Sequence, residues 1–336
     1  MAIEITATGS YVPEKVLTNE DLAEFVDTSD EWIRSHTGIG SRHVADKMEA
    51  TSDLACGAAD RALEKLSHHV SDAASELDLI VVSTASPDFP GFPSVACLVQ
   101  EHIGAHKAAA FDVAAGCTGF VYALDIAADM LASGTRKKAL VIGADTLSRI
   151  TDWTDRSTCV LFGDGAGAVV LEHTDAPTSG PGKRGIIRSV LGADGSGSQY
   201  LMLRRGGTRD PFRTGEIVDK PAHIEMNGQE VYLFAVKAVT DTIRRLLDEE
   251  GIGIDQIAKI IPHQANERII NAAAKRLGIG MDKFMMNIEK YANTSTASIP
   301  LALDEFVRSS PPAKGELLLT VGFGAGLTYG GNLIVW

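Results

Sequence analysis

The chain lacks several features that would place it in a specialised class of proteins. None of its 336 residues belongs to a run of ~18 apolar residues, so no transmembrane helix is expected. The first residues, MAIEITATGSYVPE, have neither a basic region nor an apolar core, and a secretory signal peptide is not expected. Aromatic residues are few, at 6%, but 45% hydrophobic and 22% charged residues are typical of a globular protein. This balance excludes a disordered or low-complexity chain.

Cysteine and positive charge are also scarce. The four cysteines, Cys56, Cys97, Cys117 and Cys159, include no pair with CxxC spacing. In a chain of this length that pattern predicts a reducing, cytoplasmic compartment and no zinc or other metal site. Lys and Arg number 31 against 44 Asp and Glu, which gives a net charge of −13. Nucleic acid and anionic membranes bind cationic surfaces, so neither is expected as a partner.

Short β-branched apolar runs alternate with Ala-rich stretches of helical periodicity. Expected strands cover residues 79–82, 139–142, 169–171, 260–261 and 317–321. Expected helices cover residues 54–66, 118–132, 230–247 and 267–277, with Thr51 or Ser52 as the N-cap of the first. This alternation is typical of an α/β protein with parallel strands covered by helices. At ~100–200 residues per domain, the length indicates two domains or one large fold built from two halves.

Several segments recur at one offset of 179 residues. LIVVST at 79–84 resembles AKIIPH at 258–263, ALD at 123–125 matches ALD at 302–304, and ALVIG at 139–143 resembles LLTVG at 318–322. A repeated offset predicts two similar α/β halves, roughly 1–175 and 176–336, with functional sites where their strand ends meet. Residues 178–229 are rich in Gly, Pro, Arg and Asp, and most of this stretch is predicted to be irregular covering structure.

Cys117 is the candidate nucleophile. In FDVAAGCTGF (111–120), an expected strand ends in small residues and the cysteine lies where a helix begins. Small neighbours admit a substrate, while a helix N-terminus favours the thiolate and offers backbone N–H groups to an oxyanion. A lone cysteine is more often a small buried hydrophobe, and Cys56, Cys97 and Cys159 fit that interpretation because they lie in apolar or helical runs.

Two further polar residues complete a candidate site. His263 in PHQAN directly follows the strand at 260–261 and is a candidate general base or hydrogen-bond donor to an enolate. Asn293 lies in YANTSTASIP, and the 179 offset maps Cys117 onto Thr296 in the same run. The asparagine loop should therefore face the cysteine loop. Taken alone, a structural histidine and an Asn/Ser turn are the competing interpretations.

Together these residues carry a family resemblance. Cys117 in AAGCTGF, His263 in PHQAN and Asn293 in NTSTASIP occur in that order, with DTSDEWI at 27–33, FGDGAGA at 162–168 and GFGAGLT at 322–328. The sequence from residue 3 to residue 336 resembles β-ketoacyl-acyl-carrier-protein synthase III, a condensing enzyme of the thiolase type. The resemblance implies a thiolase-like α/β fold with two pseudo-symmetric βα halves, and helices layered between and outside two mixed sheets. The N-terminal half carries the cysteine, and the C-terminal half carries the histidine and asparagine.

The resemblance also implies an activity. Cys117 takes an acyl group from acyl-coenzyme A, and malonyl on acyl carrier protein then loses CO₂. His263 and Asn293 donate hydrogen bonds to the enolate, whose carbon attacks the acyl-cysteine in a decarboxylating Claisen condensation that initiates fatty acid synthesis. No permanently bound cofactor is implied. One alternative is a starter synthase or acyltransferase of polyketide or specialised metabolism with another donor or acceptor. The other is a non-catalytic acyl-binding homologue, which would normally lack one of the three residues.

Further site residues follow from the same resemblance. It implies that the backbone N–H groups of Cys117 and Ala325 form the oxyanion hole and that Phe323 gates the site. It also implies a homodimer in which Phe92 enters the acyl pocket of the partner subunit. Trp32 and Arg156 would sandwich the coenzyme A adenine, and His36 stands where the family commonly has Arg near the phosphates. Arg268, Lys275 and Arg276, on the helix predicted at 267–277, would dock the carrier protein. Two departures, Leu233 at a basic docking position and Gly91 beside Phe92, leave donor choice and acyl length open.

Overall fold

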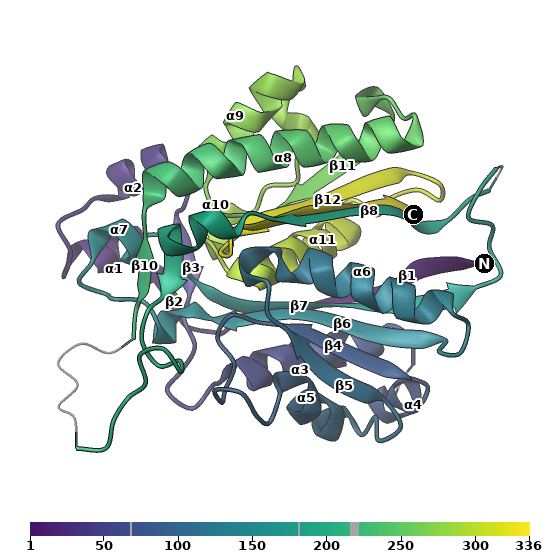
Figure 1. Cartoon of the computed structure of the whole chain (residues 1–336), viewed down its shortest axis with the longest axis horizontal. Helices are drawn as coiled ribbons and strands as arrows, with labels where there is room; N and C mark the ends of the chain where they lie inside the picture. The colour runs from purple at the N-terminus through teal and green to yellow at the C-terminus, as the bar shows by residue number, and fades with distance from the viewer. Residues whose placement is uncertain (68, 181, 216–221) are drawn as a thin grey trace.

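Two mixed β-sheets form the centre of the molecule, each built from a different part of the chain (Figure 1). The computed structural model describes residues 1–67, 69–180, 182–215 and 222–336. The first sheet has the strand order β1 (Ala2–Tyr11), β7 (Asp164–Thr174), β6 (Lys138–Thr146), β4 (Leu79–Ser83) and β5 (Ala109–Val113). The second has the order β11 (Ile257–Pro262), β12 (Leu317–Gly324), β13 (Thr328–Val335) and β8 (Gly185–Ala193). Two-stranded ladders join β2 (Val16–Thr18) to β3 (Ser41–His43) and β9 (Leu201–Leu203) to β10 (Ile224–Met226).

The strand directions explain why the sheets are mixed. Parallel pairing, which the strand–helix alternation predicts, holds for β4 with β5 and β6 and for β11 with β12. The remaining ladders of both sheets are antiparallel, including β7 with β1 and β6. A chain that crosses over through a helix pairs its strands in parallel, and a chain that turns back directly pairs them antiparallel. The mixed sheets that the family resemblance implies are confirmed.

Helices cover both sheets and separate them. The first part of the chain contributes α1 (Asn19–Ala23), α2 (Asp30–Thr37), α3 (Thr51–Leu63), α4 (Val70–Ser75), α5 (Val95–Ile103), α6 (Gly119–Ala132) and α7 (Arg156–Cys159). The second part contributes α8 (Gly228–Glu250), α9 (Glu267–Leu277), α10 (Ile288–Tyr291) and α11 (Ser298–Ser309). In the described part of the chain, no helix is both long enough and apolar enough to cross a membrane.

The core is layered because strand residues alternate in direction. Leu79 and Val81 of β4 pack against α6 and α11, whereas Ile80 and Val82 point to the opposite face and pack against α3 and α5. The second sheet likewise packs against α6 and α11 on one face, and against α8 and α9 on the other. Figure 1 shows the resulting five layers, with α8 and α9 outermost on one side and α3, α4 and α5 on the other.

The 179-residue offset reappears in the three-dimensional structure. A 3₁₀ turn at Gly116–Thr118 leads into α6, and a second 3₁₀ turn at Ser295–Ala297, 179 residues later, leads into α11. Strands β6 and β12 begin at residues 138 and 317, which are also 179 apart. Each sheet takes its strands from one side of the chain, residues 2–174 and 185–335 respectively. The division at 175/176 itself stays a prediction.

Two local predictions are wrong. The first turn of α3 is capped by Ala50 instead of Thr51 or Ser52, because the Asp53 carboxylate accepts a hydrogen bond from the Ala50 N–H at 2.8 Å and Thr51 Oγ1 instead donates to the Ser86 carbonyl at 2.6 Å. The prediction for 178–229 is wrong at its strands, because the stretch contains β8, which pairs with β13 along its length, and the β9–β10 ladder. Residues 181 and 216–221 of this stretch lie outside the described residues.

Candidate active site

Cys117 lies in the 3₁₀ turn that opens α6, between the ends of the two sheets. Its side chain is 8% exposed. The end of β12 lies against this turn. A Cβ atom added to Gly324 would lie 2.8 Å from both the Cys117 Cβ and the Cys117 backbone nitrogen. Only glycine fits so close to another backbone. The cysteine is therefore fixed in position by strands and turns of both halves of the chain.

The electrostatic environment of Cys117 opposes ionisation in the free protein. Burial raises the pKa of the thiol to about 11, although the Ser295 hydroxyl and the backbone N–H groups of Cys117 and Ala325 favour the thiolate; the Asp145 carboxylate raises the pKa further. The backbone N–H groups do favour the thiolate, as the sequence predicts, but desolvation outweighs them in the protein without substrate, and the pKa of the thiol is raised. The two N–H groups nevertheless lie beside the sulfur, where the resemblance implies an oxyanion hole.

His263 follows β11 and is almost completely buried, at 1% exposure. Its Nδ1 lies 2.6 Å from the Ser298 Oγ, and its ring meets Phe323 edge to face at a centroid distance of 5.1 Å. Burial lowers the pKa of His263 to about 3, so the imidazole is neutral at neutral pH. The Ser298 Oγ accepts a hydrogen bond from the Gln264 backbone N–H at 3.3 Å, which leaves its own proton available for Nδ1. This arrangement favours the tautomer with its proton on Nε2, where it can be donated to a substrate.

Asn293 is held by its backbone and by its side-chain oxygen. Its Oδ1 accepts a hydrogen bond from the Ser295 N–H at 2.9 Å, and its backbone N–H donates to the Leu161 carbonyl at 2.9 Å. Because Oδ1 is occupied, the amide NH₂ is the part of the side chain left to donate. Asn293 therefore adds a second neutral donor to the site.

One cavity brings the three residues together. It has a volume of about 140 Å³, and Cys117, His263 and Asn293 all line it. Its other lining residues are largely apolar and include Leu161, Val231, Ile269 and Phe323. A second cavity, of about 90 Å³, shares Cys117 with the first and is lined by Ala325, Ser295 and apolar side chains that include Leu147, Ile150 and Ile224. Cys117 thus stands between a cavity with two neutral donors and a cavity with an apolar wall.

The two predicted acyl-pocket residues are placed very differently. Phe323 is buried and lines the first cavity beside His263. Phe92 is 87% exposed and lines neither of the two cavities at Cys117.

The predicted coenzyme A residues cluster around Trp32. Arg156 lies over the Trp32 ring at 5.0 Å and donates to the Asp27 carbonyl at 2.9 Å. The His36 ring stacks on Trp32 with centroids 4.3 Å apart, and its Nδ1 lies 2.7 Å from the Trp32 carbonyl oxygen. A ring inserted between two flat groups needs about 7 Å between them, because stacked atoms approach to about 3.5 Å. Arg156 must therefore swing away from Trp32 to admit an adenine.

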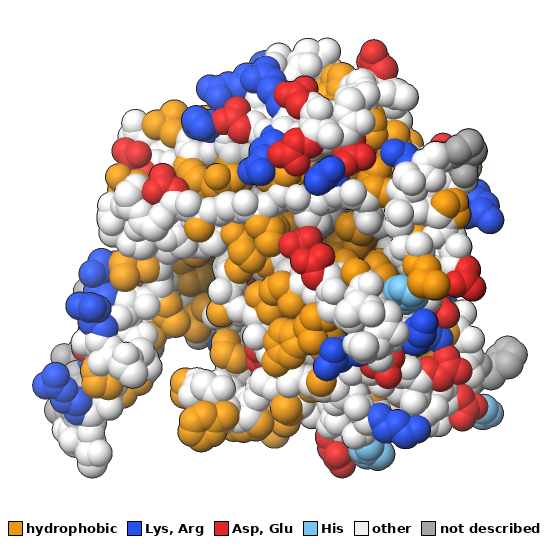
Figure 2. Space-filling model, turned by 45° about the vertical axis from the view of Figure 1, so that its right-hand side comes forward, with side chains coloured by type: hydrophobic (Ala, Val, Ile, Leu, Met, Phe, Trp, Pro, Cys, Tyr) orange, Lys and Arg blue, Asp and Glu red, His pale blue; other side chains and the backbone are white. Residues whose placement is uncertain are grey.

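Helix α9 has the two faces that its sequence predicts. Arg268, Lys275 and Arg276 are exposed, whereas Ile269 and Ala273 are buried. Leu277, expected on the buried side, is half-buried. Figure 2 shows Lys and Arg side chains at the top of the molecule, where α8 and α9 lie.

Links to neighbouring helices connect this basic face to the site. Arg268 Nε donates to the Ser35 carbonyl at 3.1 Å, which joins α9 to the helix that carries Trp32. Arg244 of α8 donates to the Arg276 carbonyl at 2.9 Å and adds a further exposed cation.

Sequence reasoning missed the groups that orient the three residues. Ser295 and Ser298 both occur in the NTSTASIP run, but their roles depend on contacts with Cys117 and His263 across the fold. Asp145, at the end of β6, is buried and accepts hydrogen bonds from the Ala85 and Thr296 backbone N–H groups. The sequence gives no local signal for Asp145, because its partners come from two distant segments, residues 84–86 and 295–296.

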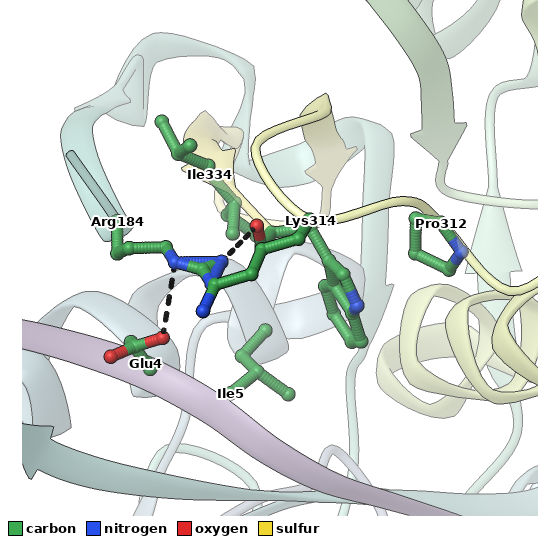
Figure 3. A pocket seen from close by; sticks show the side chains of 8 residues that line it. Glu4, Ile5, Arg184, Pro312, Lys314 and Ile334 are labelled. Atoms are coloured by element: carbon green, nitrogen blue, oxygen red, sulfur yellow. Dashed lines mark hydrogen bonds and ion pairs between the residues drawn. The ribbon is translucent and has the colours of Figure 1, made fainter. Parts of the chain in front are cut away.

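A further cavity, of about 230 Å³, lies between β1 and the segment after α11 (Figure 3). Its Arg184 Nη1 donates to the Trp336 carbonyl at 2.7 Å, and Arg184 Nε lies 3.8 Å from the Glu4 carboxylate. These contacts satisfy the guanidinium within the protein. The cavity contains none of the predicted site residues, so the site at Cys117 remains the candidate for catalysis.

Comparison with known proteins places this site in a family. The family model of 3-oxoacyl-[acyl-carrier-protein] synthase III matches residues 111–195, and the model of its C-terminal part matches residues 247–336. The chain is 50% identical to the β-ketoacyl-[acyl-carrier-protein] synthase III of Caldanaerobacter subterraneus, over 100% of this chain and 98% of that protein.

Two solved structures extend the comparison to the fold. The 3-oxoacyl-[acyl-carrier-protein] synthase III of Aquifex aeolicus has a TM-score of 0.89, at 42% identity and complete coverage of both chains. A priming β-ketosynthase of a polyketide pathway has a TM-score of 0.88, at 35% identity with 99% of this chain and 96% of that chain covered. The predicted thiolase-like fold is confirmed. The chain belongs to the β-ketoacyl-[acyl-carrier-protein] synthase III family.

Proposed function

We propose that the protein is an acyltransferase that condenses an acyl-coenzyme A starter with malonyl-acyl carrier protein and so initiates fatty acid synthesis. The observation that carries this proposal is that Cys117, His263 and Asn293 line the same cavity. A nucleophilic sulfur beside two neutral donors suits acyl transfer followed by enolate formation better than hydrolysis, which needs a base to activate water. Acyl-coenzyme A is a substrate in this scheme, and no bound cofactor is required.

In the first half-reaction, the Cys117 sulfur attacks the thioester carbonyl of the starter. The proton of Cys117 leaves with the coenzyme A sulfur as the thioester bond breaks, and the acyl group remains on Cys117. Backbone N–H groups of Cys117 and Ala325 stabilise the oxyanion, in keeping with their position beside the sulfur. The apolar cavity on the far side of Cys117 then takes the acyl chain.

In the second half-reaction, malonyl on the carrier protein occupies the cavity with the two donors. The bond to its carboxyl carbon breaks, CO₂ leaves, and the electron pair forms an enolate. The His263 Nε2–H and the Asn293 NH₂ donate to the enolate oxygen. The enolate carbon then attacks the acyl carbonyl, and the Cys117 sulfur leaves as a thiolate and takes up one proton from water.

A panel of acyl-coenzyme A donors tests the proposal. Each donor is incubated with the protein and malonyl-acyl carrier protein, while mass spectrometry follows acyl-Cys117 and the 3-ketoacyl product. The proposal predicts both species and release of CO₂. Acylation without decarboxylation would contradict it and would favour an acyltransferase of specialised metabolism.

The proposal also covers the oligomeric state and the location of the protein. The exposed Phe92 side chain is proposed to enter the acyl pocket of a partner subunit in a homodimer, which would cover an aromatic surface that water otherwise surrounds. A cytoplasmic location stays a prediction from the low cysteine content. Neither nucleic acid nor a membrane is proposed as a partner.

The carrier protein is proposed to dock on the exposed face of α9. The double variant Arg268→Glu/Lys275→Glu should raise the KM for malonyl-acyl carrier protein by about tenfold or more at low salt, because charge reversal replaces attraction of an acidic partner by repulsion. The kcat/KM for acyl-coenzyme A in the first half-reaction should change much less. Lys15→Glu/Lys107→Glu changes two exposed cations of the other half by the same charge and serves as the control. Equal KM values for both double variants would contradict the docking site.

His36 is proposed to weaken the contact with the coenzyme A phosphates relative to an arginine. Arginine offers a planar fork of charged donors, whereas the histidine side chain is shorter and the His36 Nδ1 lies 2.7 Å from the Trp32 carbonyl oxygen. His36→Arg should therefore raise kcat/KM for acyl-coenzyme A. An equal value, or a loss, would favour a donor other than coenzyme A.

A further inference from the structure

A hydroxyl group touches the nucleophile from the opposite half of the chain. The Ser295 Oγ lies 3.4 Å from the Cys117 Sγ, within hydrogen-bond distance for sulfur, and both side chains are buried. The hydroxyl also forms a hydrogen bond with the Asp145 carboxylate, so Asp145 and the sulfur compete for its proton. Ser295 has a backbone φ of 51°, in the left-handed region that side chains other than glycine rarely adopt. A serine kept in a conformation that favours glycine is a candidate for a functional role.

Hydrogen bonds of the following residue hold Ser295 in this place. The next residue, Thr296, donates its backbone N–H to the Asp145 carboxylate at 3.2 Å and its hydroxyl to the Ser83 Oγ at 3.0 Å. The Asp145 carboxylate also accepts the Ala85 N–H at 2.7 Å. Strand ends of the first sheet thus fix the 3₁₀ turn of the second half and direct the serine hydroxyl at the sulfur.

We propose that Ser295 is a further catalytic residue, whose hydroxyl donates to the Cys117 sulfur whenever that sulfur carries negative charge. The sulfur carries this charge twice, when it attacks the acyl donor and when it leaves the acyl-enzyme, so the role deepens the function proposed above.

The other donors near the sulfur cannot replace this hydroxyl throughout the reaction. In the scheme above, the N–H groups of Cys117 and Ala325 donate to the carbonyl oxygen once a tetrahedral intermediate forms. The titratable groups facing the sulfur are Asp145, whose charge opposes a thiolate, and His263, which burial keeps neutral. Ser295 then supplies the remaining side-chain donor to the leaving sulfur.

The test uses Ser295→Ala and Ser295→Gly, which remove the hydroxyl with opposite effects on the backbone. Glycine adopts a φ of 51° more readily than serine, so Ser295→Gly relieves the backbone strain of the turn, whereas Ser295→Ala leaves that strain in place. The readout is the rate at which iodoacetamide alkylates Cys117, resolved from exposed Cys97 by peptide mass spectrometry. In the wild type this rate should rise about tenfold per pH unit between pH 7 and 9, because the thiol pKa is about 11.

Both variants should alkylate about tenfold more slowly than the wild type at pH 8, the effect of one hydrogen bond to a charged group. The control is Thr294→Val, which removes the neighbouring buried hydroxyl, a group without a hydrogen-bond partner in the part of the chain that the structure describes. It should leave the rate within twofold of the wild type. Wild-type rates in both Ser295 variants, or slowing in Ser295→Ala alone, would overturn the proposal. Alkylation needs neither acyl-coenzyme A nor a carrier protein, so this result is independent of the proposed condensation.

Discussion

Replacement of Cys117 by serine should lower acyl transfer from acyl-coenzyme A by about 10³-fold or more. A serine hydroxyl ionises far less readily than a thiol, and the burial that already raises the cysteine pKa to about 11 would oppose a serine alkoxide still more strongly. The buried His263 imidazole, with a pKa of about 3, is too weak a base to compensate. The measurement is the rate of labelled acyl-enzyme formation, followed by quenching and intact-protein mass spectrometry.

The other cysteines provide the matched controls for this result. Cys97 is exposed, whereas burial raises the pKa values of Cys56 to about 12 and of Cys159 to about 11. Cys97→Ser and Cys159→Ser should acylate at the wild-type rate. Peptide mapping of the wild-type adduct should find the acyl group on Cys117 alone. An acyl group on Cys97 with Cys117 free would exclude Cys117 as the nucleophile.

The sequence is sufficient to predict the architecture because its regularities are strong and local. The continuous apolar run of β4, which is buried on both faces, and the helical periodicity of residues 267–277 depend on neighbouring residues, and the structure confirms both. The 179-residue offset adds a long-range prediction to these local ones: the cysteine and asparagine loops face each other. The 3.4 Å contact between Ser295 and Cys117 confirms it.

Other features depend on contacts that no local pattern encodes. Strand β8 was missed because Gly185, Arg188 and Ser189 interrupt its apolar pattern, and its pairing with β13 is decided by the fold. The N-cap of α3 was misassigned because Thr51 has a tertiary partner in the Ser86 carbonyl. The direction of the Cys117 pKa shift follows from burial and from Asp145, and neither can be read from the residues beside the cysteine.

Replacement of His263 or Asn293 by alanine should lower malonyl decarboxylation by about 10²-fold or more and leave acylation of Cys117 measurable. Each variant removes one neutral donor to the enolate, and a lost oxyanion donor costs a factor of this size. Asn293→Asp is the sharper variant, because it keeps the shape of the side chain but replaces the NH₂ donor by an acceptor. Ser298→Ala should have a smaller effect of the same kind, since it removes the hydroxyl that orients the His263 ring.

The pH profile separates a donor from a general base at His263. Because burial lowers its pKa to about 3, the imidazole stays neutral, and wild-type decarboxylation should show no histidine step between pH 5.5 and 8. A base with an ordinary pKa would instead lose activity below about pH 6.5. Decarboxylation is measured as release of labelled CO₂ from malonyl-acyl carrier protein, and acylation as the burst of acyl-Cys117 in the same variants. Normal decarboxylation by Asn293→Ala, or a wild-type step near pH 6.5, would contradict the two-donor mechanism.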